Sequence, residues 1–408
     1  MNLLPPCRFS GADDLEPVMY LGETPVADRL LDRPVPQAES SLVPLQLAFS
    51  DTSKLLQLTH TVPATLLYNE NYPYFSSVSP ALLQHFRTSA GKILEKKQPG
   101  HRHLVIEAAS NDGYMLQNFV SRNIPVLGIE PARKQAEIAR QKNIPTLDAF
   151  FTRALAESLA ADGRMADIFI ANNVLAHAED LNDFVAGMAI LLKEDGLAVV
   201  EVPYVMDMIG QGEFDTVYHQ HIYYFSLTSL LYVFNTYNLH VNHVERLDIH
   251  GGSLRFYVQK HRLQDKSVEL LLEEENVAGI ENTTYYRTLE TRAGKLKQDL
   301  TSLLDNIKSR GERIAAYGAA AKATTFMSYM ELDNSIIDYV VDRNPVKHGK
   351  YMPGNLLEIF DCEKLVRDNP DYTLVLAWNF ANEIMTEMEK YRSNGGRFII
   401  PIPELMVA

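Results

Sequence analysis

The stretch VIEAASNDGYML, residues 105–116, decides the fold of this 408-residue chain. A short run that suits a buried strand is followed at once by a polar loop with one glycine, and a helical pattern begins there. Strand and helix patterns then alternate as far as residue 203, through runs such as VLGIE, DIFIANN and LAVVEVP. This alternation predicts a parallel sheet with helices on both faces.

The rest of the chain divides around this unit, which we assign to residues 86–264. Residues 1–85 are rich in proline and polar residues, which predicts a small irregular N-terminal domain. Residues 265–310 are charged with helical spacing and predict a helical connector, and a second strand-helix alternation fills residues 311–408. The predicted class is therefore α/β, with a central Rossmann-like domain and a second Rossmann-like domain at the C-terminus.

Composition excludes several classes of function. The net charge of −14 argues against a general nucleic-acid binder, because phosphate backbones require a basic surface. Two cysteines cannot build a disulfide framework, which fits a reducing compartment. No signal-peptide pattern and no apolar run long enough for a membrane span is visible, so we expect a cytoplasmic protein without a membrane partner.

The polar loop has the features of a cofactor site. Glu107, Ser110, Asn111 and Gly113 lie at the carboxyl end of the first strand, and Glu130 ends the next one. A carboxylate at that second position can accept hydrogen bonds from both hydroxyls of a ribose. The loop lacks the G-x-G-x-x-G fingerprint for a pyrophosphate, so a ligand without phosphate and with a cationic tail, such as S-adenosylmethionine, suits it better. An ordinary strand-helix turn with capping residues is the alternative.

Two further segments fall where such a cofactor needs walls. In LDAFF, residues 147–151, Asp148 can meet the adenine amine and Phe150 can lie against its ring. In ANNVLAH, residues 171–177, Asn172, Asn173 and His177 follow a strand and are expected to face the cleft. Buried amides are costly unless they are hydrogen-bonded, which is consistent with a functional role. A purely structural role for either segment is the alternative.

An aromatic and histidine-rich segment, FDTVYHQHIYYFS at residues 214–226, follows the cofactor unit. A carbon nucleophile needs a base to remove a proton next to a carbonyl, and the ordinary pKa of histidine suits that task. Tyrosine hydroxyls can hold the oxygen on which negative charge develops. A buried aromatic patch is the alternative. The candidates are His219, His221, Tyr218, Tyr223 and Tyr224 here, with Tyr72 and Tyr74 from NENYPYFSS at residues 69–77.

A glycine-containing loop, HGGSLRFYV at residues 250–258, completes the candidate site. Gly251 and Gly252 permit close approach of a backbone, and Arg255 can clamp an anion. His250 and Ser253 are their polar neighbours. A β-turn with an exposed arginine is the alternative.

Four motifs, IEAASNDG, YHQHIYYFS, HGGSLR and YGAAAKATT, together resemble the sugar C-methyltransferases that act on nucleotide-linked 4-keto deoxysugars. The resemblance covers nearly the whole chain. It implies methyl transfer from S-adenosylmethionine to C-3 of a 4-keto-6-deoxyhexose carried on a nucleoside diphosphate. It also implies that His221 is the base and that Tyr218, His177 and a tyrosine of NYPYFSS line the sugar site.

Two departures from the family pattern stand out. Gln220 precedes the base histidine where the family usually has a glutamate. The family's N-terminal domain generally carries two cysteine pairs that bind zinc, whereas here Cys7 is accompanied by Ser10, Ser50 and Ser53. Serine hydroxyls are poor zinc ligands, so we expect no structural zinc and no other metal.

The C-terminal alternation opens with a tight turn at Gly318 and a helix that carries Lys322, which can meet a phosphate. Asp342 follows the next strand, and LAWNF adds Trp378 and Asn379. A nicotinamide site is an alternative, weakened by the absent G-x-G-x-x-G pattern. The resemblance instead implies that this domain holds the nucleotide-sugar.

The residues leave three rival functions open. Methylation at oxygen or nitrogen of a sugar would not need a neighbouring ketone. A NAD-dependent sugar reductase or epimerase would use the C-terminal unit. A protein that binds S-adenosylmethionine without catalysis would follow if Gln220 had abolished turnover. We expect a monomer or a weak homodimer.

Overall fold

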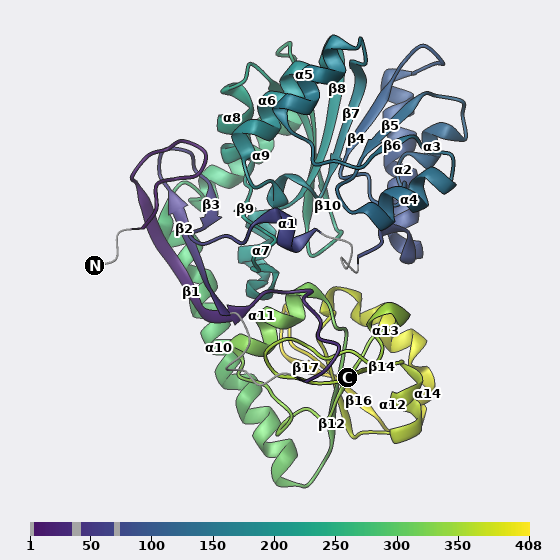
Figure 1. Cartoon of the computed structure of the whole chain (residues 1–408). Coiled ribbons are helices and arrows are strands. Elements are labelled where there is room, and N and C mark those ends of the chain that lie inside the picture. The colour runs from purple at the N-terminus through teal and green to yellow at the C-terminus, as the bar shows by residue number, and fades with distance from the viewer. Residues whose placement is uncertain (1–3, 35–41, 69–73) are drawn as a thin grey trace.

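A computed structural model describes residues 4–34, 42–68 and 74–408 of the chain. Three β-sheets organise these residues, as Figure 1 shows. The seven-stranded sheet occupies the upper part of the view, the six-stranded sheet lies below it, and the four-stranded sheet flanks both. The predicted α/β class with two Rossmann-like units is confirmed.

The seven-stranded sheet has the strand order β10-β11-β8-β7-β4-β5-β6. The five neighbouring strands from β8 to β6 are parallel to one another. The strand β11 is antiparallel to its neighbours β8 and β10, so β10 runs in the same direction as the five. The strands are β4 (Val105–Ala108), β5 (Val126–Ile129), β6 (Thr146–Leu147), β7 (Ala166–Asn172), β8 (Leu192–Pro203), β10 (His240–Leu247) and β11 (Ser253–Gln259). The chain order reverses between β4 and β7, which is where ligands bind in such sheets.

Helices cover both faces of this sheet because the strands are apolar on both sides. One face packs against α2 (Pro80–Lys97), α3 (Gln117–Val120) and α4 (Arg133–Gln141). The other packs against α5 (Arg153–Ala161), α6 (Leu181–Leu191) and α8 (Leu227–Asn235). Short helical segments follow β7 at η3 (Leu175–His177) and β8 at α7 (Val205–Gln211), and η4 (Phe214–Thr216) comes directly after α7.

The N-terminal region forms an antiparallel sheet in the order β1-β2-β3-β9. Its own strands are β1 (Leu15–Pro25), β2 (Leu42–Ser50) and β3 (Leu56–Leu58), and its short helical turns are α1 (Ala64–Leu67) and η2 (Ser76–Val78). The fourth strand, β9 (Tyr223–Tyr224), comes from the aromatic and histidine-rich segment. The N-terminal sheet therefore fixes one end of that segment directly.

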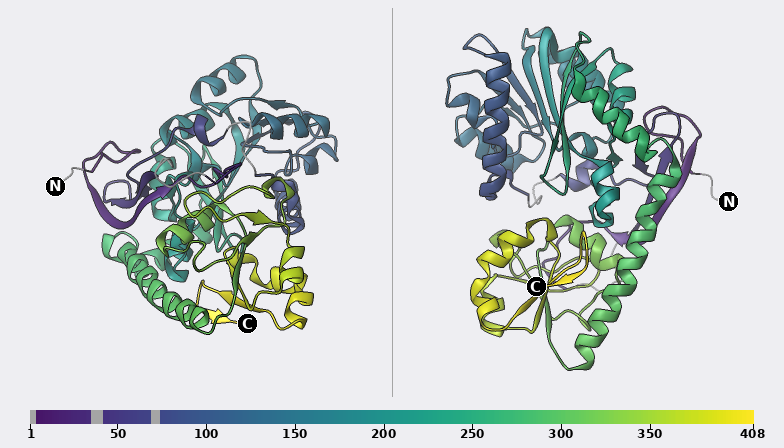
Figure 2. Two further views of the ribbon diagram at one scale, coloured as in Figure 1. Left: turned by 60° about the horizontal axis from the view of Figure 1, so that its bottom comes forward. Right: turned by 180° about the vertical axis from the view of Figure 1, so that it is seen from behind.

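A helical connector leads to the last sheet. It consists of α9 (Lys266–Ala278) and the 27-residue α10 (Thr283–Ser309). Figure 2 shows α10 running along the side of the molecule from the N-terminal sheet to the C-terminal part. At its start Tyr286 stacks on Phe49 of β2 with ring centroids 4.7 Å apart, and at its end Leu304 and Ile307 enter the core beside Ile314. The N-terminal sheet and the C-terminal unit thus share one continuous core.

The C-terminal sheet has the strand order β14-β13-β12-β15-β16-β17 and is parallel except for β17. Its strands are β12 (Ile314–Tyr317), β13 (Val340–Val341), β14 (Ile359–Phe360), β15 (Tyr372–Val375), β16 (Arg397–Ile400) and β17 (Met406–Val407). Its helices are α11 (Ala321–Tyr329), η5 (Pro345–Lys347), α12 (Glu363–Asp368), η6 (Trp378–Phe380), α13 (Ala381–Glu387) and α14 (Glu389–Ser393). The order reverses between β12 and β15, which gives a second ligand-type crevice. Among the described helices, none combines the length and apolarity that crossing a bilayer requires.

Candidate active site

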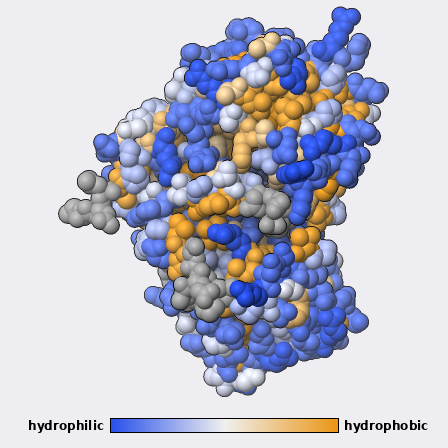
Figure 3. Space-filling model, viewed as in Figure 1, coloured by the Kyte–Doolittle hydropathy of each residue, from blue (hydrophilic) through white to orange (hydrophobic). Residues whose placement is uncertain are grey.

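A cavity of about 850 Å³ lies between the two parallel sheets. The loops that follow β4, β5 and β7 line one end, and the loops that follow β12 and β13 line the other. Figure 3 shows apolar side chains among polar ones on this side of the molecule, where the upper and lower parts meet. The carboxyl edges of both sheets therefore open into a single space, with the histidine-rich segment between them.

Five of the predicted cofactor residues line the cavity: Asn111, Glu130, Phe150, Asn172 and Asn173. The carboxylate of Glu130 accepts hydrogen bonds of 2.8 Å from the backbone N–H groups of Asn111 and Ala132. Burial raises the pKa of Glu130 to about 7, against those backbone hydrogen bonds. The buried side-chain oxygens of Asn172 and Asn173 have no hydrogen-bond partner among the described residues. Groups of this kind suit a polar ligand with hydroxyls and amines.

The other four predicted cofactor residues lie behind or beside this lining. Glu107 is fully buried and accepts a 3.4 Å hydrogen bond from Asn172, so it supports the wall from beneath. A Cβ at Gly128 would approach the Ser110 hydroxyl to 2.4 Å, and one at Gly113 would meet Ile144 at 2.3 Å. Ser110 and Gly113 therefore serve close packing of the loop. Asp148 is exposed at the rim, near enough to Glu130 for its charge to raise that pKa.

A segment from the N-terminal region covers the cofactor loop. The carbonyl of Tyr74 accepts hydrogen bonds from Gln135 at 3.0 Å and from Asn111 at 3.4 Å. The backbone N–H of Ser76 donates to Asn111 at 2.9 Å, and the Ser77 hydroxyl donates to Asp112. Tyr74 itself lines the cavity. Tyr72, predicted beside it, lies outside the described residues.

Tyr218 and His221 form a hydrogen-bonded pair in the lining of the cavity. Nδ1 of His221 lies 3.0 Å from the carbonyl of Thr216, and Nε2 lies 2.7 Å from the Tyr218 hydroxyl. Because a carbonyl only accepts, Nδ1 carries the proton and Nε2 accepts from the tyrosine. Burial and the neighbouring His177 hold the pKa of His221 well below its ordinary value. The ring is therefore neutral at pH 7, with its basic lone pair on Nε2.

His177 stands beside this pair, with ring centroids 4.8 Å from those of His221. Its Nδ1 lies 2.7 Å from the carbonyl of Gln220 and 2.8 Å from the Tyr68 hydroxyl. By the same reasoning Nδ1 donates to the carbonyl. Burial lowers the pKa of His177 to about 4, so it too is neutral at pH 7.

The two residues that precede the base histidine, His219 and Gln220, both contact the N-terminal region, and of the two Gln220 alone lines the cavity. The Gln220 side-chain N–H donates to the carbonyl of Ala27 at 2.9 Å, and its other side-chain atom, Oε1, has no partner among the described residues. His219 is 1% exposed and turns toward the backbone carbonyls of Pro44 and Val43 in the N-terminal sheet. It does not line the cavity, so it is not placed to substitute for a missing acid next to His221.

The glycine-containing loop at residues 250–258 packs closely against carboxylates of the chain. His250 and Gly252 line the cavity. A Cβ on Gly251 would lie 2.2 Å from a carboxylate oxygen of Glu213, and one on Gly252 would lie 2.3 Å from Asp207. Both glycines also have positive φ, of 91° and 125°. Their lack of a side chain is therefore needed for internal packing.

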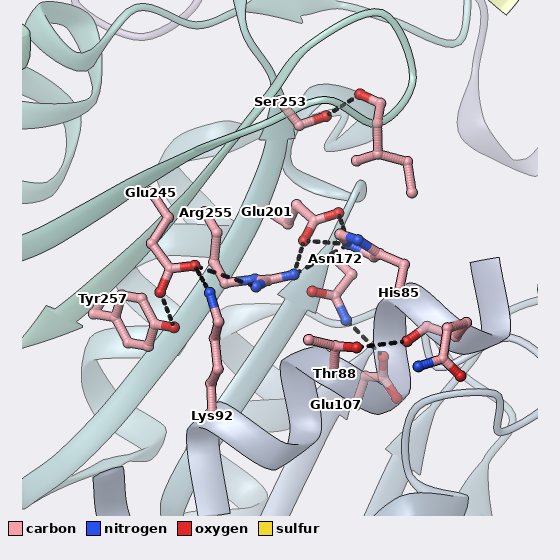
Figure 4. A network of polar contacts seen from close by, with 12 residues as sticks. His85, Thr88, Lys92, Glu107, Asn172, Glu201, Glu245, Ser253, Arg255 and Tyr257 are labelled. Atoms are coloured by element: carbon pink, nitrogen blue, oxygen red, sulfur yellow. Dashed lines mark hydrogen bonds and ion pairs between the residues drawn. The ribbon is translucent and has the colours of Figure 1, made fainter. Parts of the chain in front are cut away.

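Arg255 and Ser253 do not line the cavity, and their polar contacts are drawn in Figure 4. The Arg255 guanidinium donates to Glu201 at 2.8 Å and lies 3.6 Å from Glu245. His85 of α2 completes the cluster, with Nε2 2.9 Å from Glu201. Ser253 donates to the carbonyl of Ile249 at 3.0 Å. The predicted anion clamp is thus occupied by a buried ion pair that ties α2 to β8 and β11.

At the C-terminal end, Gly318, Lys322 and Asn379 line the cavity as predicted for a substrate site. Lys322 Nζ lies 2.5 Å from the Asn379 side-chain oxygen and 3.6 Å from the centroid of the Trp378 ring. Burial lowers the pKa of Lys322 to about 8, although the carboxyls of Asp215 and Glu213 oppose this. The ammonium is thus held by a cation–π contact within a largely enclosed space.

Asp342 accepts hydrogen bonds of 2.8 Å from the backbone of Ala319 and Asn344, so it stabilises the turn after β13. Sequence reasoning missed several other lining residues: Asp28, Tyr68, Glu213, Arg343 and Lys347. Arg343 directly follows the noted Asp342, and Lys347 comes four residues later. Tyr68 and Glu213 directly precede the noted segments 69–77 and 214–226. Position near a candidate motif was the signal available for these four, and Asp28 had none.

The residues at the expected zinc position do not fit that metal. Cys7 Sγ lies 3.3 Å from the Ser53 hydroxyl, and Ser50 donates to Asp14 at 2.9 Å. The Ser10 hydroxyl accepts from the backbone of Ala12 at 3.3 Å. One thiol among three hydroxyls lacks the donors that a tetrahedral zinc site needs. Within the described ranges, no group of three or more His, Cys, Asp or Glu side chains is arranged for a metal ion.

Comparison with known proteins gives family matches along the chain. A model described as "Putative zinc binding domain" matches residues 7–68, "Methyltransferase domain" matches 68–244, and "C-methyltransferase C-terminal domain" matches 248–403. Solved structures that resemble part of the chain include an S-adenosylmethionine-dependent methyltransferase of Thermotoga maritima, described as a possible histamine N-methyltransferase. It is 15% identical with a TM-score of 0.34, covering 44% of this chain and 92% of that one.

Magnesium protoporphyrin IX methyltransferase of Synechocystis PCC 6803 is 14% identical with a TM-score of 0.33, covering 43% of this chain and 78% of its own. C-methyltransferase NovU of Streptomyces niveus is 32% identical over 402 residues, which span 98% of this chain and 95% of that protein. The chain therefore belongs to the family of S-adenosylmethionine-dependent C-methyltransferases, and it is an enzyme of that class.

Proposed function

We propose that the protein transfers a methyl group to C-3 of a 4-keto-6-deoxyhexose carried on a nucleoside diphosphate. The observation that supports this is the neutral Tyr218–His221 pair in a cavity shared by the carboxyl edges of two parallel sheets. One edge offers a cofactor-type loop, and the other brings three cationic side chains to the lining. A substrate that reaches from the pair to those cations would have a reactive sugar at one end and a charged carrier at the other.

The residues at the first edge suit S-adenosylmethionine. When bound, it supplies a methyl group on a positively charged sulfur. We expect Glu130 to accept hydrogen bonds from the ribose hydroxyls and Phe150 to lie against the adenine, with Asp148 at the amine. The unpartnered side-chain oxygens of Asn172 and Asn173 are available to the amino-acid end.

His221 is the group proposed to create the carbon nucleophile. Its Nε2 lone pair would take the proton from C-3, and the electrons of that C–H bond would move onto the ketone oxygen at C-4. The Tyr218 hydroxyl, which donates to Nε2 here, can turn to that oxygen as negative charge develops. The acidified carbon and the ketone oxygen are separated by one atom, so a base and a donor already in contact can address both. His177, with Tyr74 and Tyr72, would line the remaining sides of the sugar.

The second edge is proposed to hold the nucleoside diphosphate. Lys322, Arg343 and Lys347 bring three cations to the lining. Gly318 has φ of 103°, and a Cβ there would lie 2.8 Å from Ala377, so the chain can pass close to the site only without a side chain. Asn379 fixes the Lys322 ammonium. We place this reaction in the cytoplasm, where activated sugars and the methyl donor are both made.

The test is turnover in deuterated water with dTDP- and GDP-linked 4-keto-6-deoxyhexoses, read by mass spectrometry. We expect one methyl to be gained and, when the methyl donor is left out, one deuterium to enter at C-3. The His221→Asn variant should lose both signals while keeping its affinity for S-adenosylhomocysteine. Methyl gain on sugars that lack the ketone would instead establish transfer to oxygen or nitrogen. Cofactor binding without any turnover would indicate a catalytically silent protein.

A further inference from the structure

A strap of the N-terminal region crosses from β1 to the C-terminal sheet and carries an acidic residue into the cavity. In Figure 1 the dark purple chain leaves β1 and runs toward the lower part of the molecule. One side of the strap is held where the Ala27 carbonyl accepts from Gln220 at 2.9 Å. The other side is held where Leu31 and Tyr351 exchange backbone hydrogen bonds of 3.0 and 2.8 Å. Asp28 lies between these two anchors.

The backbone at Asp28 directs its side chain in an uncommon way. Its φ is 60°, in the left-handed region that aspartate and asparagine enter more readily than most residues. The half-buried carboxylate lines the cavity. Within the described residues it makes no hydrogen bond or ion pair, although two fixed anchors hold its backbone. A carboxylate placed in this way is free to bind a ligand.

The surroundings of Asp28 identify which part of a substrate it can meet. Its charge contributes to raising the pKa of both Tyr68 and Tyr218, so it lies within electrostatic reach of the proposed sugar site. Burial raises the pKa of Asp28 itself, with Lys347 lowering it and Asp342 raising it. Lys347 donates to the Ala319 carbonyl at 2.7 Å and lies 3.7 Å from Asp342, so these two contacts hold it at the cationic end of the cavity. Asp28 therefore stands where the sugar end of the cavity passes into the cationic end.

We propose that Asp28 binds a hydroxyl of the hexose and so sets which sugars are accepted. This inference rests on the function proposed above. The negative charges of Asp28 and nearby Asp342 disfavour a phosphate at this place. A carboxylate such as that of Asp28 is instead a strong acceptor for a hydroxyl. In a 4-keto-6-deoxyhexose C-1 carries the nucleotide, C-4 is the ketone and C-6 is a methyl group. The hydroxyls left for Asp28 are those at C-2 and C-3.

The experiment combines variants of Asp28 with substrates that lack one hydroxyl. Asp28→Asn removes the charge and keeps the shape, and Asp28→Gly removes the side chain while tolerating positive φ. Both are assayed with the complete 4-keto-6-deoxyhexose and with its 2-deoxy and 3-deoxy forms. We expect kcat/KM of Asp28→Gly to fall about 10- to 100-fold on the complete sugar, the range of one hydrogen bond to a charged group. On the form that lacks the bound hydroxyl, the same variant should match the parent protein.

Asp32 supplies a matched control. It lies on the same strap but is 91% exposed, with Lys350 at 3.8 Å. Asp32→Gly should leave kcat/KM unchanged on every sugar. An equal loss for Asp28→Gly on all three sugars, or no loss on any, would overturn the proposal. Turnover by the parent protein reports separately on the proposed function, because the inference is read only from ratios between substrates.

Discussion

Replacement of Tyr218 by phenylalanine tests the central step most directly. The change removes one hydroxyl and keeps the ring that packs against His221 at a centroid distance of 4.1 Å. In the free protein the loss is one hydrogen bond of 2.7 Å, worth about 1 kcal/mol. In the transition state the loss is a donor to a developing oxyanion in an enclosed site, which typically costs about 100- to 1,000-fold in kcat.

The difference between the small loss in the free protein and the large loss in the transition state distinguishes a catalytic role of Tyr218 from a structural one. We expect kcat of Tyr218→Phe to fall by about 100-fold or more, with little change in KM or in affinity for S-adenosylhomocysteine. Deuterium entry at C-3 without the methyl donor should slow by a similar factor, because the same enolate forms in both reactions. Quenched-flow mass spectrometry measures both rates on one substrate.

Tyr339→Phe is the matched control. Tyr339 is a buried tyrosine of the C-terminal core, and its hydroxyl has no partner among the described residues. That variant should keep parental kinetics. If Tyr218→Phe lost no more activity than Tyr339→Phe, or if methyl transfer fell while deuterium entry stayed at the parental rate, the assignment of Tyr218 to the ketone oxygen would be wrong.

Two further predictions concern cofactor binding at Glu130 and zinc in the N-terminal domain. Burial raises the pKa of Glu130 to about 7, so the ionised fraction of its carboxyl increases as pH rises through 7. The affinity for S-adenosylhomocysteine should increase with that fraction. Calorimetry from pH 6 to 8 should show this increase for the parent protein and a constant affinity for Glu130→Gln. Since the N-terminal loops are joined by hydroxyls and a single thiol, purified protein should contain far less than one zinc per chain by elemental analysis, and EDTA should leave its melting temperature unchanged. Stoichiometric zinc, or melting shifted by EDTA, would contradict this second prediction.

The parts of the fold that follow from local patterns could be predicted from the sequence. The alternation after residue 105 determines two parallel sheets, because hydrophobic period and loop polarity are properties of neighbouring residues. Asn111 and Glu130 could be placed in the cofactor site for the same reason: each lies in the loop after a strand, and the carboxyl ends of parallel strands share an edge.

Contacts between distant segments could not be predicted in this way. From the sequence, Arg255 is expected to be a free cation near two glycines. In the structure it is paired with Glu201, which lies 54 residues earlier in the chain. Gly251 and Gly252 are expected to leave space for a ligand, but the carboxylates of Glu213 and Asp207 approach them in the structure. Asp28 has no motif at all, and only the strap between two sheets brings it to the site.

Gln220 shows why a departure from a family pattern needs the structure to be understood. Its side-chain N–H holds Ala27, next to Asp28, and its backbone carbonyl orients His177. A glutamate would place a carboxylate oxygen against the Ala27 carbonyl and leave a buried acceptor unpaired, at a cost of about 1–3 kcal/mol. We therefore expect Gln220→Glu to lower kcat/KM by about 10-fold or more.

Gln220→Met, which also lacks the donor but adds no charge, should lower kcat/KM to a similar extent, whereas a role in proton transfer predicts that the two variants diverge. Gain of activity in Gln220→Glu would show that this position relays a proton and that glutamine has weakened the enzyme. A similar loss of kcat/KM in both variants would show that the Gln220 amide links the segment of the base histidine to the strap that carries Asp28. The residue that departs from the family pattern would then also position Asp28 against the sugar.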